Sequence, residues 1–222
     1  DELDPLTEKQ QLLSSDPSRP PNLAECFTIF SRIHRATSSL DHISRVARET
    51  VEDFARDNVQ YAELRTTPRV LDNGSSSRFD YLKTVSAALQ QTAEKHGIHI
   101  GILVSIDRAR PIDQAQEALR SARELIQTDS SVAIVGAEMS GDPHKGHFRD
   151  CLPALEYART QLGLPISVHI GEVAGKESDD ECLQVIHWGH AKRIGHAVMC
   201  GDAVFHELQS LSHPPALEVC LA

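Results

Sequence analysis

The segment PISVHIGEVAGKE, residues 165–177, carries the pattern that decides the fold. Its apolar run ends at His169, and Gly171 then permits a sharp bend before Glu172. A short buried strand that ends in a glycine bend and leads into a helix forms one β/α unit. The strand end therefore presents two side chains, His169 and Glu172, that can exchange protons or bind a metal.

The same unit recurs along the chain. Strand-like runs are expected at 59–68, 99–107, 131–142, 165–172, 193–198 and 216–222. Helical stretches are expected between them, at 77–97, 112–128, 148–163, 179–189 and 203–212. Strands that alternate with helices predict a parallel sheet built through right-handed crossovers.

The chain before the first strand divides into three parts. Residues 1–22 are polar and rich in proline, and they are interpreted as a flexible lead-in. Two amphipathic helices are then expected at 23–39 and 41–58, the second with Asp41 as its N-cap. The buried side of that second helix is expected to carry Ile43, Val46, Val51 and Phe54.

Two architectures fit this alternation, a doubly wound sheet and a β/α barrel. No glycine-rich phosphate loop follows the first strand, which counts against the doubly wound sheet. Polar side chains gather instead where the strands end, which is where barrels carry their chemistry. These are Arg65, Thr66, Thr67, Arg69, Asp107, Arg108, Gly141, Asp142, His169, Glu172 and His196. The prediction is an α/β fold, an incomplete (β/α)8 TIM barrel with about six of eight strands, in one domain at 23–222.

Composition excludes several classes of protein. The formal net charge is −10 and no run of Lys and Arg occurs, which argues against a nucleic-acid partner. No apolar stretch is long enough to span a membrane, and the acidic N-terminal residues are not expected to form a signal peptide. Five cysteines without a C-x-x-C pair indicate a reducing compartment, so a cytoplasmic location is predicted.

The candidate residues also have structural explanations. The pattern of His169 and Glu172 is explained equally by a histidine in the core and a glutamate at the start of a helix, without any catalytic role. His196, at the end of the next strand, is explained equally by a hydrogen bond inside the sheet. Gly141 lies either in a plain turn or where a flat ligand approaches the backbone. Thr66, Thr67 and Arg69 suit either a helix cap or a phosphate.

Other polar groups are assigned structural or surface positions. Ser178 or Asp179 is interpreted as the N-cap of the helix that follows, because acidic groups stabilise the N-terminus of a helix. Two histidine pairs lack a carboxylate partner at metal-ligand spacing and are predicted to lie on the surface. They are His144 with His147 and His187 with His190.

Four motifs in order carry a resemblance to a known family. YAELRTTPR, GAEMSGDP, SVHIGE and RIGHA resemble the adenosine deaminase family over residues 23–220, and FSRIHRATSSLDHI is similar to its branch that acts on N6-methyl-AMP. The resemblance implies a zinc-dependent (β/α)8 barrel that hydrolyses the 6-amino or 6-methylamino group of a purine nucleotide or nucleoside to give the inosine product. Its partner is thus a small molecule, with no nucleic acid and no membrane.

Individual roles follow from the same resemblance. His169 matches a zinc ligand, Glu172 the acid that protonates the purine ring, and His196 the histidine beside the activated water. Gly141 matches a backbone contact to the purine. The positions that hold the nucleotide correspond to His34, Thr66, Thr67, Pro68, Arg69 and Asp107.

This sequence departs from the family pattern in three places. The 222 residues contain neither the H-x-H strand nor the paired-aspartate strand of the family, so three of four expected protein ligands to zinc are missing. Ala197 stands where the family commonly has glycine. This form is therefore predicted to be inactive alone and to self-associate, although the family is mostly monomeric. A non-catalytic fragment that acts by protein pairing and another metal-dependent hydrolase of the same barrel superfamily stay as alternatives.

Overall fold

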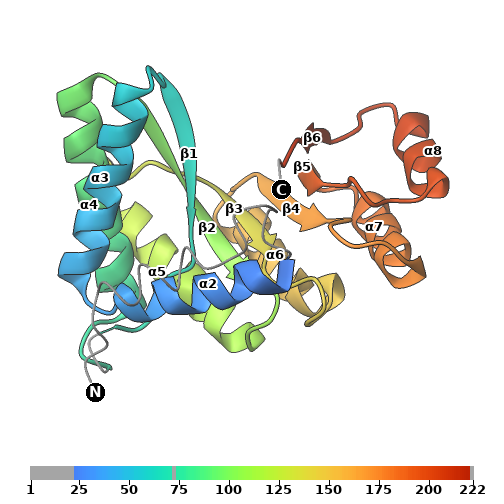
Figure 1. Ribbon diagram of the computed structural model, residues 1–222, viewed down its shortest axis with the longest axis horizontal. Helices are drawn as coiled ribbons and strands as arrows, with labels where there is room; N and C mark the ends of the chain where they lie inside the picture. Colours follow the sequence, from blue (N-terminus) through green and yellow to red (C-terminus); the bar gives the residue numbers. More distant parts are fainter. Residues whose placement is uncertain (1–22, 72–73, 221–222) are drawn as a thin grey trace.

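The described part of the protein, a computed structural model over residues 23–71 and 74–220, contains a single sheet of six parallel strands (Figure 1). The predicted lead-in at 1–22 lies outside these residues. The strands follow one another across the sheet in sequence order. They are β1 Tyr61–Thr66, β2 His99–Asp107, β3 Ile134–Ser140, β4 Ile166–Ile170, β5 Ala191–His196 and β6 Ala216–Glu218. A doubly wound sheet would reverse its order at a switch point, so this topology confirms the prediction of a partial β/α barrel.

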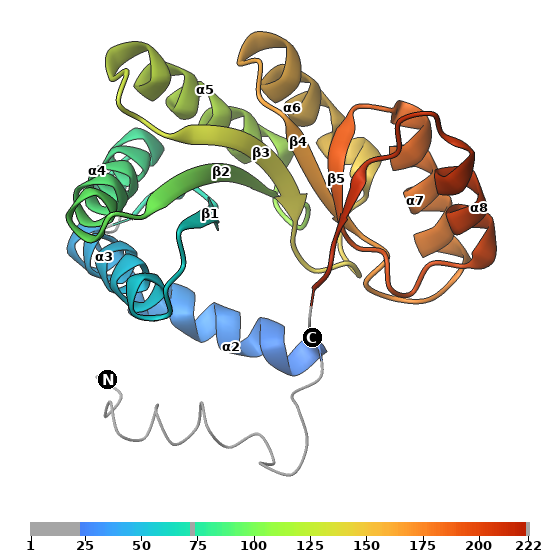
Figure 2. The ribbon, with the colours of Figure 1, turned by 90° about the horizontal axis from the view of Figure 1, so that it is seen from above.

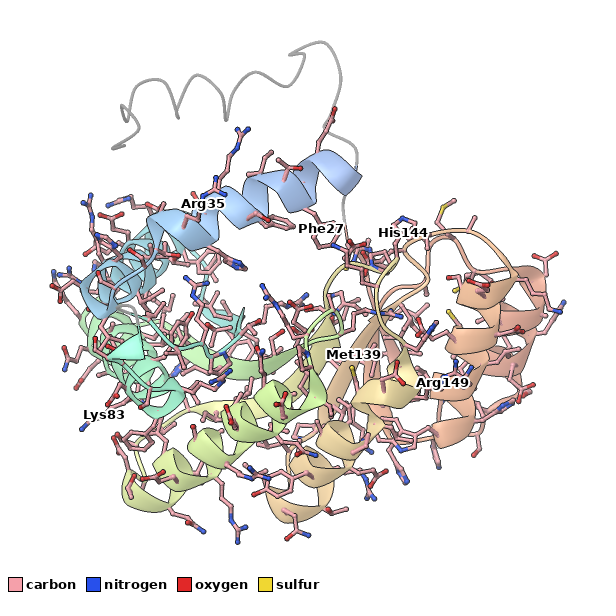
Figure 3. The ribbon with its side chains drawn as sticks, turned by 90° about the horizontal axis from the view of Figure 1, so that it is seen from below. Phe27, Arg35, Lys83, Met139, His144 and Arg149 are labelled. Carbon is pink, nitrogen blue, oxygen red and sulfur yellow. The ribbon has the colours of Figure 1, made fainter. Side chains whose placement is uncertain are left out.

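Helices cover the outer, convex side of the curved sheet, one after each of the first five strands (Figure 2). They are α4 Arg78–His96, α5 Ile112–Thr128, α6 Phe148–Gln161, α7 Lys176–Trp188 and α8 Asp202–Ser210. Two further helices, α2 Leu23–Ala36 and α3 Leu40–Arg56, precede β1. Figure 3 shows that α2 runs across the open side of the sheet, whereas α3 packs beside α4.

The core lies between the sheet and its outer helices, in two clusters. The larger cluster joins β2–β5 to α5, α6, α7 and α8, and the smaller one joins β1 and β2 to α3 and α4. Strand β2 is buried over almost its whole length because helices cover its outer face and the neighbouring strands flank it. This buried sheet fixes where each strand ends, and hence where the polar side chains meet.

Three local predictions were wrong. Helix α3 is capped by Ser39, whose hydroxyl accepts the backbone N–H of His42, so Asp41 lies in the first turn instead. Val46 is 48% exposed, because the buried stripe of α3 follows four-residue steps from Ile43 to Val51 through Ala47.

The predicted cap of α7 was also misplaced. The helix begins at Lys176 after Gly175, with no side-chain cap, so Ser178 and Asp179 lie inside its first turn. Asp179 accepts the backbone N–H of Gly201 at 2.8 Å and so fastens the start of α8 to α7. The need to satisfy that N–H, which the sequence does not reveal, explains the acidic residue here.

An unexpected layer of charge fills the concave side of the sheet. Arg193 of β5 pairs with Glu63 of β1 at 2.6 Å and with Glu218 of β6 at 3.0 Å. Arg65 of β1 approaches Glu218 at 3.6 Å. Strands β1 and β5 are not neighbours in the sheet, so these pairs connect its two ends across the interior and support its curvature.

None of the helices in the described part of the chain combines the length and the apolar character needed to cross a bilayer.

Candidate functional site

The two candidate histidines lie side by side at one end of the sheet. His169 is in β4 and His196 ends β5, the adjacent strand, where Ile170 is paired with His196. Their ring centroids are 5.3 Å apart, with the ring planes at 70°. The parallel register between β4 and β5 therefore brings together two imidazoles that are separated by 26 residues of chain.

The environment of His169 fixes the position of its proton. Its Nδ1 lies 3.1 Å from Oε2 of Glu138, a fully buried carboxylate on β3. Its Nε2 lies 2.5 Å from Nη1 of Arg65, which can only donate. With Nε2 as the acceptor from Arg65, the proton of a neutral ring lies on Nδ1, which faces Glu138 at 3.1 Å without the geometry of a hydrogen bond. This is the tautomer that a metal-binding histidine adopts when a carboxylate holds its other nitrogen.

Glu138 is stabilised as a carboxylate despite its burial. Burial alone would raise its pKa, but His169 and Ser105 beside the carboxylate outweigh burial and lower the pKa below its usual range. The hydroxyl of Ser140 also donates to Glu138 at 2.9 Å. Sequence reasoning did not single out Glu138; the only available signal was an acidic residue inside the apolar run SVAIVGAEMSGD.

Glu172 reaches the same end of the sheet because the backbone bends at Gly171, which has a φ of 69°. A Cβ at Gly171 would lie 2.5 Å from Sγ of Cys200, so only glycine fits. The Glu172 carboxylate comes within 3.8 Å of Nε2 of His196. Burial raises the pKa of Glu172 against the opposing influence of His169 and Arg108.

The pKa of His196 moves in the opposite direction. Burial lowers it first, and the neighbouring His169 and Arg65 lower it further. His196 is therefore mainly neutral at pH 7, and the acid form of Glu172 persists to higher pH than that of an exposed glutamate. A carboxylic acid and a neutral imidazole in contact can donate and accept a proton, respectively.

The turn after β5 is held against the turn after β4. The backbone N–H of Ala197 donates to the carbonyl of Ile170 at 2.9 Å, and that of Met199 donates to Gly171 at 3.0 Å. His196 and Ala197 both have positive φ, 66° and 56°. Left-handed backbone favours glycine, which accounts for the expectation that related sequences carry glycine where this chain has Ala197.

A second group of predicted residues lines a separate cavity of about 290 Å³ between α2, the end of β1 and the start of α5. It includes five of the residues matched to nucleotide-holding positions, apart from Thr66: His34, Thr67, Pro68, Arg69 and Asp107. Sequence reasoning missed two further arginines in its lining, Arg78 and Arg110, because neither ends a strand. The cavity thus contains three guanidinium groups in a chain with a net charge of −10.

Burial and the charges around this cavity shift the pKa of His34. Burial, Arg69 and Arg110 lower the pKa of His34, in that order of influence, against the weaker effect of Asp107. Arg69 donates to the carbonyl and to the hydroxyl of Thr37, at 2.7 and 2.6 Å, and so fixes the end of α2 over the cavity.

Two predicted residues lie outside that lining. The Thr66 hydroxyl pairs with the hydroxyl of Tyr81 at 2.8 Å and is directed toward α4. Gly141 has a φ of 113° at the end of β3, and its Cα faces the Asp107 carboxylate. Gly141 follows β3, and β3 lies between β2, which leads to Asp107, and β4, which contains His169.

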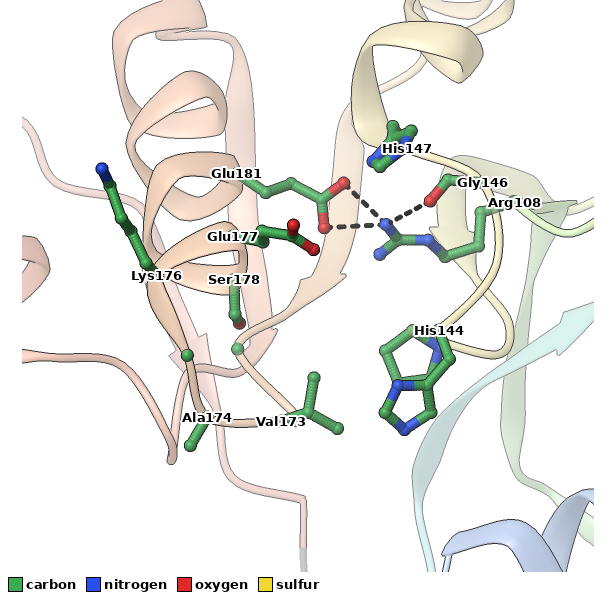
Figure 4. A pocket seen from close by; sticks show the side chains of 13 residues that line it. Arg108, His144, Gly146, His147, Val173, Ala174, Lys176, Glu177, Ser178 and Glu181 are labelled. Atoms are coloured by element: carbon green, nitrogen blue, oxygen red, sulfur yellow. Dashed lines mark hydrogen bonds and ion pairs between the residues drawn. The ribbon is translucent and has the colours of Figure 1, made fainter.

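A buried ion pair between Arg108 and Glu181 holds the loop after β3 (Figure 4). Arg108, 3% exposed, binds both carboxylate oxygens of Glu181 at 2.6 and 2.8 Å. It also donates to the carbonyls of Lys145 and Gly146, and Glu181 accepts the N–H of Phe148 at 2.6 Å. These contacts fasten the loop after β3 to α7 and frame a cavity of about 440 Å³.

The remaining histidines match their predicted surface positions. His144, His147, His187 and His190 are all exposed. One group of three potential metal ligands occurs in the described residues, and it combines His169 and His196 with Cys220.

Comparison with protein families gives one match across nearly the whole chain. The model of the adenosine deaminase family matches residues 5–222. An adenosine deaminase-like protein of Drosophila melanogaster is 36% identical over 197 residues, which is 88% of this chain and 56% of that protein. An N6-mAMP deaminase of Arabidopsis thaliana is 32% identical over 222 residues, 90% of this chain and 59% of that protein. The chain thus spans somewhat more than half the length of these relatives.

Solved structures agree with the sequence relatives. The Arabidopsis ADAL protein complexed with IMP superposes with a TM-score of 0.84 at 32% identity, covering 98% of this chain and 62% of that chain. The same protein complexed with GMP gives a TM-score of 0.81 at 31% identity, covering 96% and 62%.

Proposed function

Because the chain belongs to the adenosine deaminase family, we propose that it forms part of the active site of a hydrolase that removes the 6-substituent of a purine nucleotide. The substrate is N6-methyl-AMP, and the products are IMP and methylamine. The observation that carries this proposal is the contact between Glu172, whose pKa is raised, and neutral His196 next to His169.

Each of these residues has a distinct part in the reaction. Purine C6 is a poor electrophile, and Glu172 donates its proton to the ring so that C6 accepts a nucleophile. His196, neutral at pH 7, accepts a proton from the attacking water and orients it. Gly141 offers a strand-end backbone that a flat base can approach closely.

The surroundings of His169 fit zinc. With the ring proton on the side of Glu138, Nε2 carries the lone pair that would bind the metal, and the half-exposed Arg65, which contacts that nitrogen here, would have to turn away. When bound, zinc supplies Lewis acidity that lowers the pKa of water from about 15.7 to about 7. His169 is the family ligand that this sequence provides.

The arginine-lined cavity favours a nucleotide over a nucleoside as the substrate. Arg69 and Arg110 face it from the loops after β1 and β2, and His34 faces it from α2. Arg110 already pairs with Asp107 at 3.3 Å, whereas the Arg69 guanidinium contacts only the neutral oxygens of Thr37, so a 5′-phosphate would supply an anion that a nucleoside lacks. An anion there also stabilises protonated His34, whose pKa the arginines lower in its absence.

We further propose that the 222 residues alone do not turn over substrate, since three of the four family ligands to zinc have no counterpart in them. Self-association of this span is supported by two unpaired sheet edges, β1 and β6, within the described residues. Apolar side chains stand exposed beside them, Tyr61 at 58% and Val219 at 80%. The cytoplasmic location stays a prediction.

A chimera tests the proposed function. Residues 23–220 replace the equivalent span of the Arabidopsis N6-mAMP deaminase, so that the rest of the barrel comes from the relative. The chimera is expected to release methylamine from N6-methyl-AMP in the presence of zinc, and the 222-residue chain alone is expected to release none. A folded, zinc-loaded chimera without methylamine release would refute the proposal.

Replacing Arg69 by Met tests the nucleotide preference. Loss of one charge-assisted hydrogen bond costs about 1.5–3 kcal/mol, so KM for N6-methyl-AMP in the chimera should rise roughly 10- to 150-fold. The value for N6-methyladenosine should rise less, because the nucleoside has no phosphate and loses only the positioning of α2 by the contacts of Arg69 with Thr37. Arg35→Met, an exposed arginine on the same helix as His34, is the control. Equal effects on both substrates would contradict a phosphate contact.

Gly195→Ala tests the position of His169. A Cβ at Gly195 would lie 2.6 Å from Cδ2 and 2.7 Å from Nε2 of His169, so the imidazole must move by about 1 Å. A displacement of that size lowers kcat by about 100-fold. Initial rates of the chimera measure the effect, and Lys192→Ala, at an exposed position of the same strand, is the control. An unchanged kcat would show that His169 does not need this position.

A further inference from the structure

Two cysteines from adjacent β/α units lie with their thiols in contact. Cys182 is on α7, and Cys200 is in the turn between β5 and α8. Their sulfur atoms are 3.3 Å apart, within hydrogen-bond distance, and both thiols are free. We propose that Cys182 and Cys200 form a dithiol redox site, in which oxidation by a small disulfide joins the two sulfurs in one reversible bond.

The surroundings of the two thiols favour this bond. Cys182 is 1% exposed and belongs to the larger core cluster, against which Cys200 also packs. On its other side, Sγ of Cys200 faces Gly171, where an added Cβ would lie 2.5 Å from it. A disulfide bond is about 2.05 Å long, so the two sulfurs need to approach by only about 1.2 Å. Rotation of the Cys200 side chain can supply that movement, because the residue lies in a turn.

The two thiols differ in access and in acidity. Cys200 is half-buried, and the adjacent Val198 and Met199 are 59% and 48% exposed, so the turn is open to a small reagent. The hydrogen bond from Cys182 lowers the pKa of the Cys200 thiol, whereas burial and the nearby Asp179 oppose that shift. The same hydrogen bond and then burial raise the pKa of Cys182. Cys200 is therefore the attacking thiolate, and Cys182 is the thiol that completes the bond.

The reaction with oxidised glutathione, as the small disulfide, consists of two exchanges. The Cys200 thiolate attacks one sulfur of glutathione disulfide, the S–S bond of the reagent breaks, and one glutathione leaves. Cys182 then gives up its proton and attacks the Cys200 sulfur of this mixed disulfide, and the second glutathione leaves. The two electrons lost by the cysteine pair reduce the glutathione disulfide, and the two thiol protons end on the released glutathione molecules.

The bond would connect the two segments that leave the candidate site. Cys182 lies on the helix that follows Glu172, and Cys200 lies in the turn that follows His196. That turn is already held against the turn after β4 by backbone hydrogen bonds. Oxidation adds a covalent link to α7 and so closes the chain around Glu172 and His196. The redox site does not depend on the proposed function, because its chemistry requires neither substrate nor zinc.

The other three cysteines are less suited to this reaction. Cys151 is buried on α6, and burial raises the pKa of its thiol to about 11. Cys26 lies on α2, and Cys220 lies beyond the end of β6. Distance along the chain would not select a pair, because Cys200 is 18 residues from Cys182 and almost as far from Cys220. Selection of Cys182 therefore requires the folded contact.

Peptide mapping of the oxidised 222-residue chain tests the site. The folded chain is incubated in a glutathione redox buffer, free thiols are blocked with N-ethylmaleimide, and disulfide-linked peptides are identified by mass spectrometry. The expected product is the Cys182–Cys200 bond, and dithiothreitol should remove it. The same chain oxidised in urea is the matched control, and it should give Cys182–Cys200 and Cys200–Cys220 bonds in similar amounts.

Variants and a stability measurement complete the test. Cys182→Ala should leave Cys200 as a mixed disulfide with glutathione, whereas Cys26→Ser should retain the Cys182–Cys200 bond. Far-UV circular dichroism verifies that each variant is folded, and the map of the unmodified chain decides the result if Cys182→Ala is not. The oxidised chain should unfold at a thermal midpoint about 5–10 °C above that of the reduced chain, because the bond constrains the unfolded state.

Four results would overturn the proposal. They are a folded chain that stays reduced, a different cysteine pair, an unmodified chain in which Cys200 stops at the mixed disulfide, and a Cys182–Cys200 bond that does not raise the thermal midpoint. None of these results would affect the chimera experiment, and an inactive chimera would leave the redox site standing.

Discussion

The Glu172→Gln chimera is expected to lose about 10²- to 10⁴-fold in kcat, with little change in the affinity for N6-methyl-AMP. Glutamine keeps the shape and the hydrogen-bonding capacity of the side chain but cannot deliver a proton. Burial raises the pKa of Glu172, so the acid form persists to higher pH than that of an exposed glutamate. Activity of the unmodified chimera should accordingly fall as pH rises through this raised pKa.

Methylamine release and the binding of IMP separate the two effects. Glu177→Gln is the matched control, because Glu177 lies five residues further on in α7 and is exposed. A Glu172→Gln variant that retained full kcat would exclude Glu172 as the acid. A variant that lost IMP binding as well would assign the side chain to substrate binding.

The second large effect concerns stability. Replacing Arg108 by Leu should lower the free energy of unfolding of the 222-residue chain by about 3–5 kcal/mol, because Glu181 would remain charged without its partner in a buried position. The change would also remove the donors to the carbonyls of Lys145 and Gly146, which attach the loop after β3 to α7. Urea unfolding followed by circular dichroism measures it.

A double variant shows whether the unpaired charge causes the loss. Arg108→Leu with Glu181→Leu should be more stable than Arg108→Leu alone, since no uncompensated charge is left. Arg45→Met breaks a pair between exposed side chains, 70% and 54% accessible, and should leave the unfolding midpoint unchanged. Equal midpoints for Arg108→Leu and Arg45→Met would show that burial of the pair does not matter.

The order of elements was predictable because hydrophobic periodicity is a local property. Helix α5 begins and ends at the predicted residues, Ile112 and Thr128, and β2 coincides with 99–107. The errors lie at helix starts, where capping depends on single hydrogen bonds. Ser39, and not Asp41, caps α3. Asp179 accepts the N–H of Gly201, which belongs to another β/α unit, and does not cap its own helix.

The candidate site was predictable only as a set of residues. The glycine bend at Gly171 and the strand ends at His169 and His196 predicted three polar groups at one rim. In the structure the register of β4 against β5 brings the two imidazoles together, and Glu172 lies 3.8 Å from His196. Their chemical roles stay proposals. Arg78 and Arg110 could not be recognised, since neither occupies a strand end and each joins the cavity through the packing of a helix or a loop.

The sequence by itself determined the alternation of strands and helices, and with it a parallel barrel-like sheet whose polar residues share one end. Hydrophobic periodicity and the bends at glycines depend on residues close together in the chain, so a single segment is enough to reveal them. Only the tertiary structure decided that Glu138 lies behind His169, that Arg65 points at its other nitrogen, and that Arg193 links β5 to β1. These contacts join residues far apart in the chain, and they form where the curved sheet brings buried and half-buried polar groups within reach of one another.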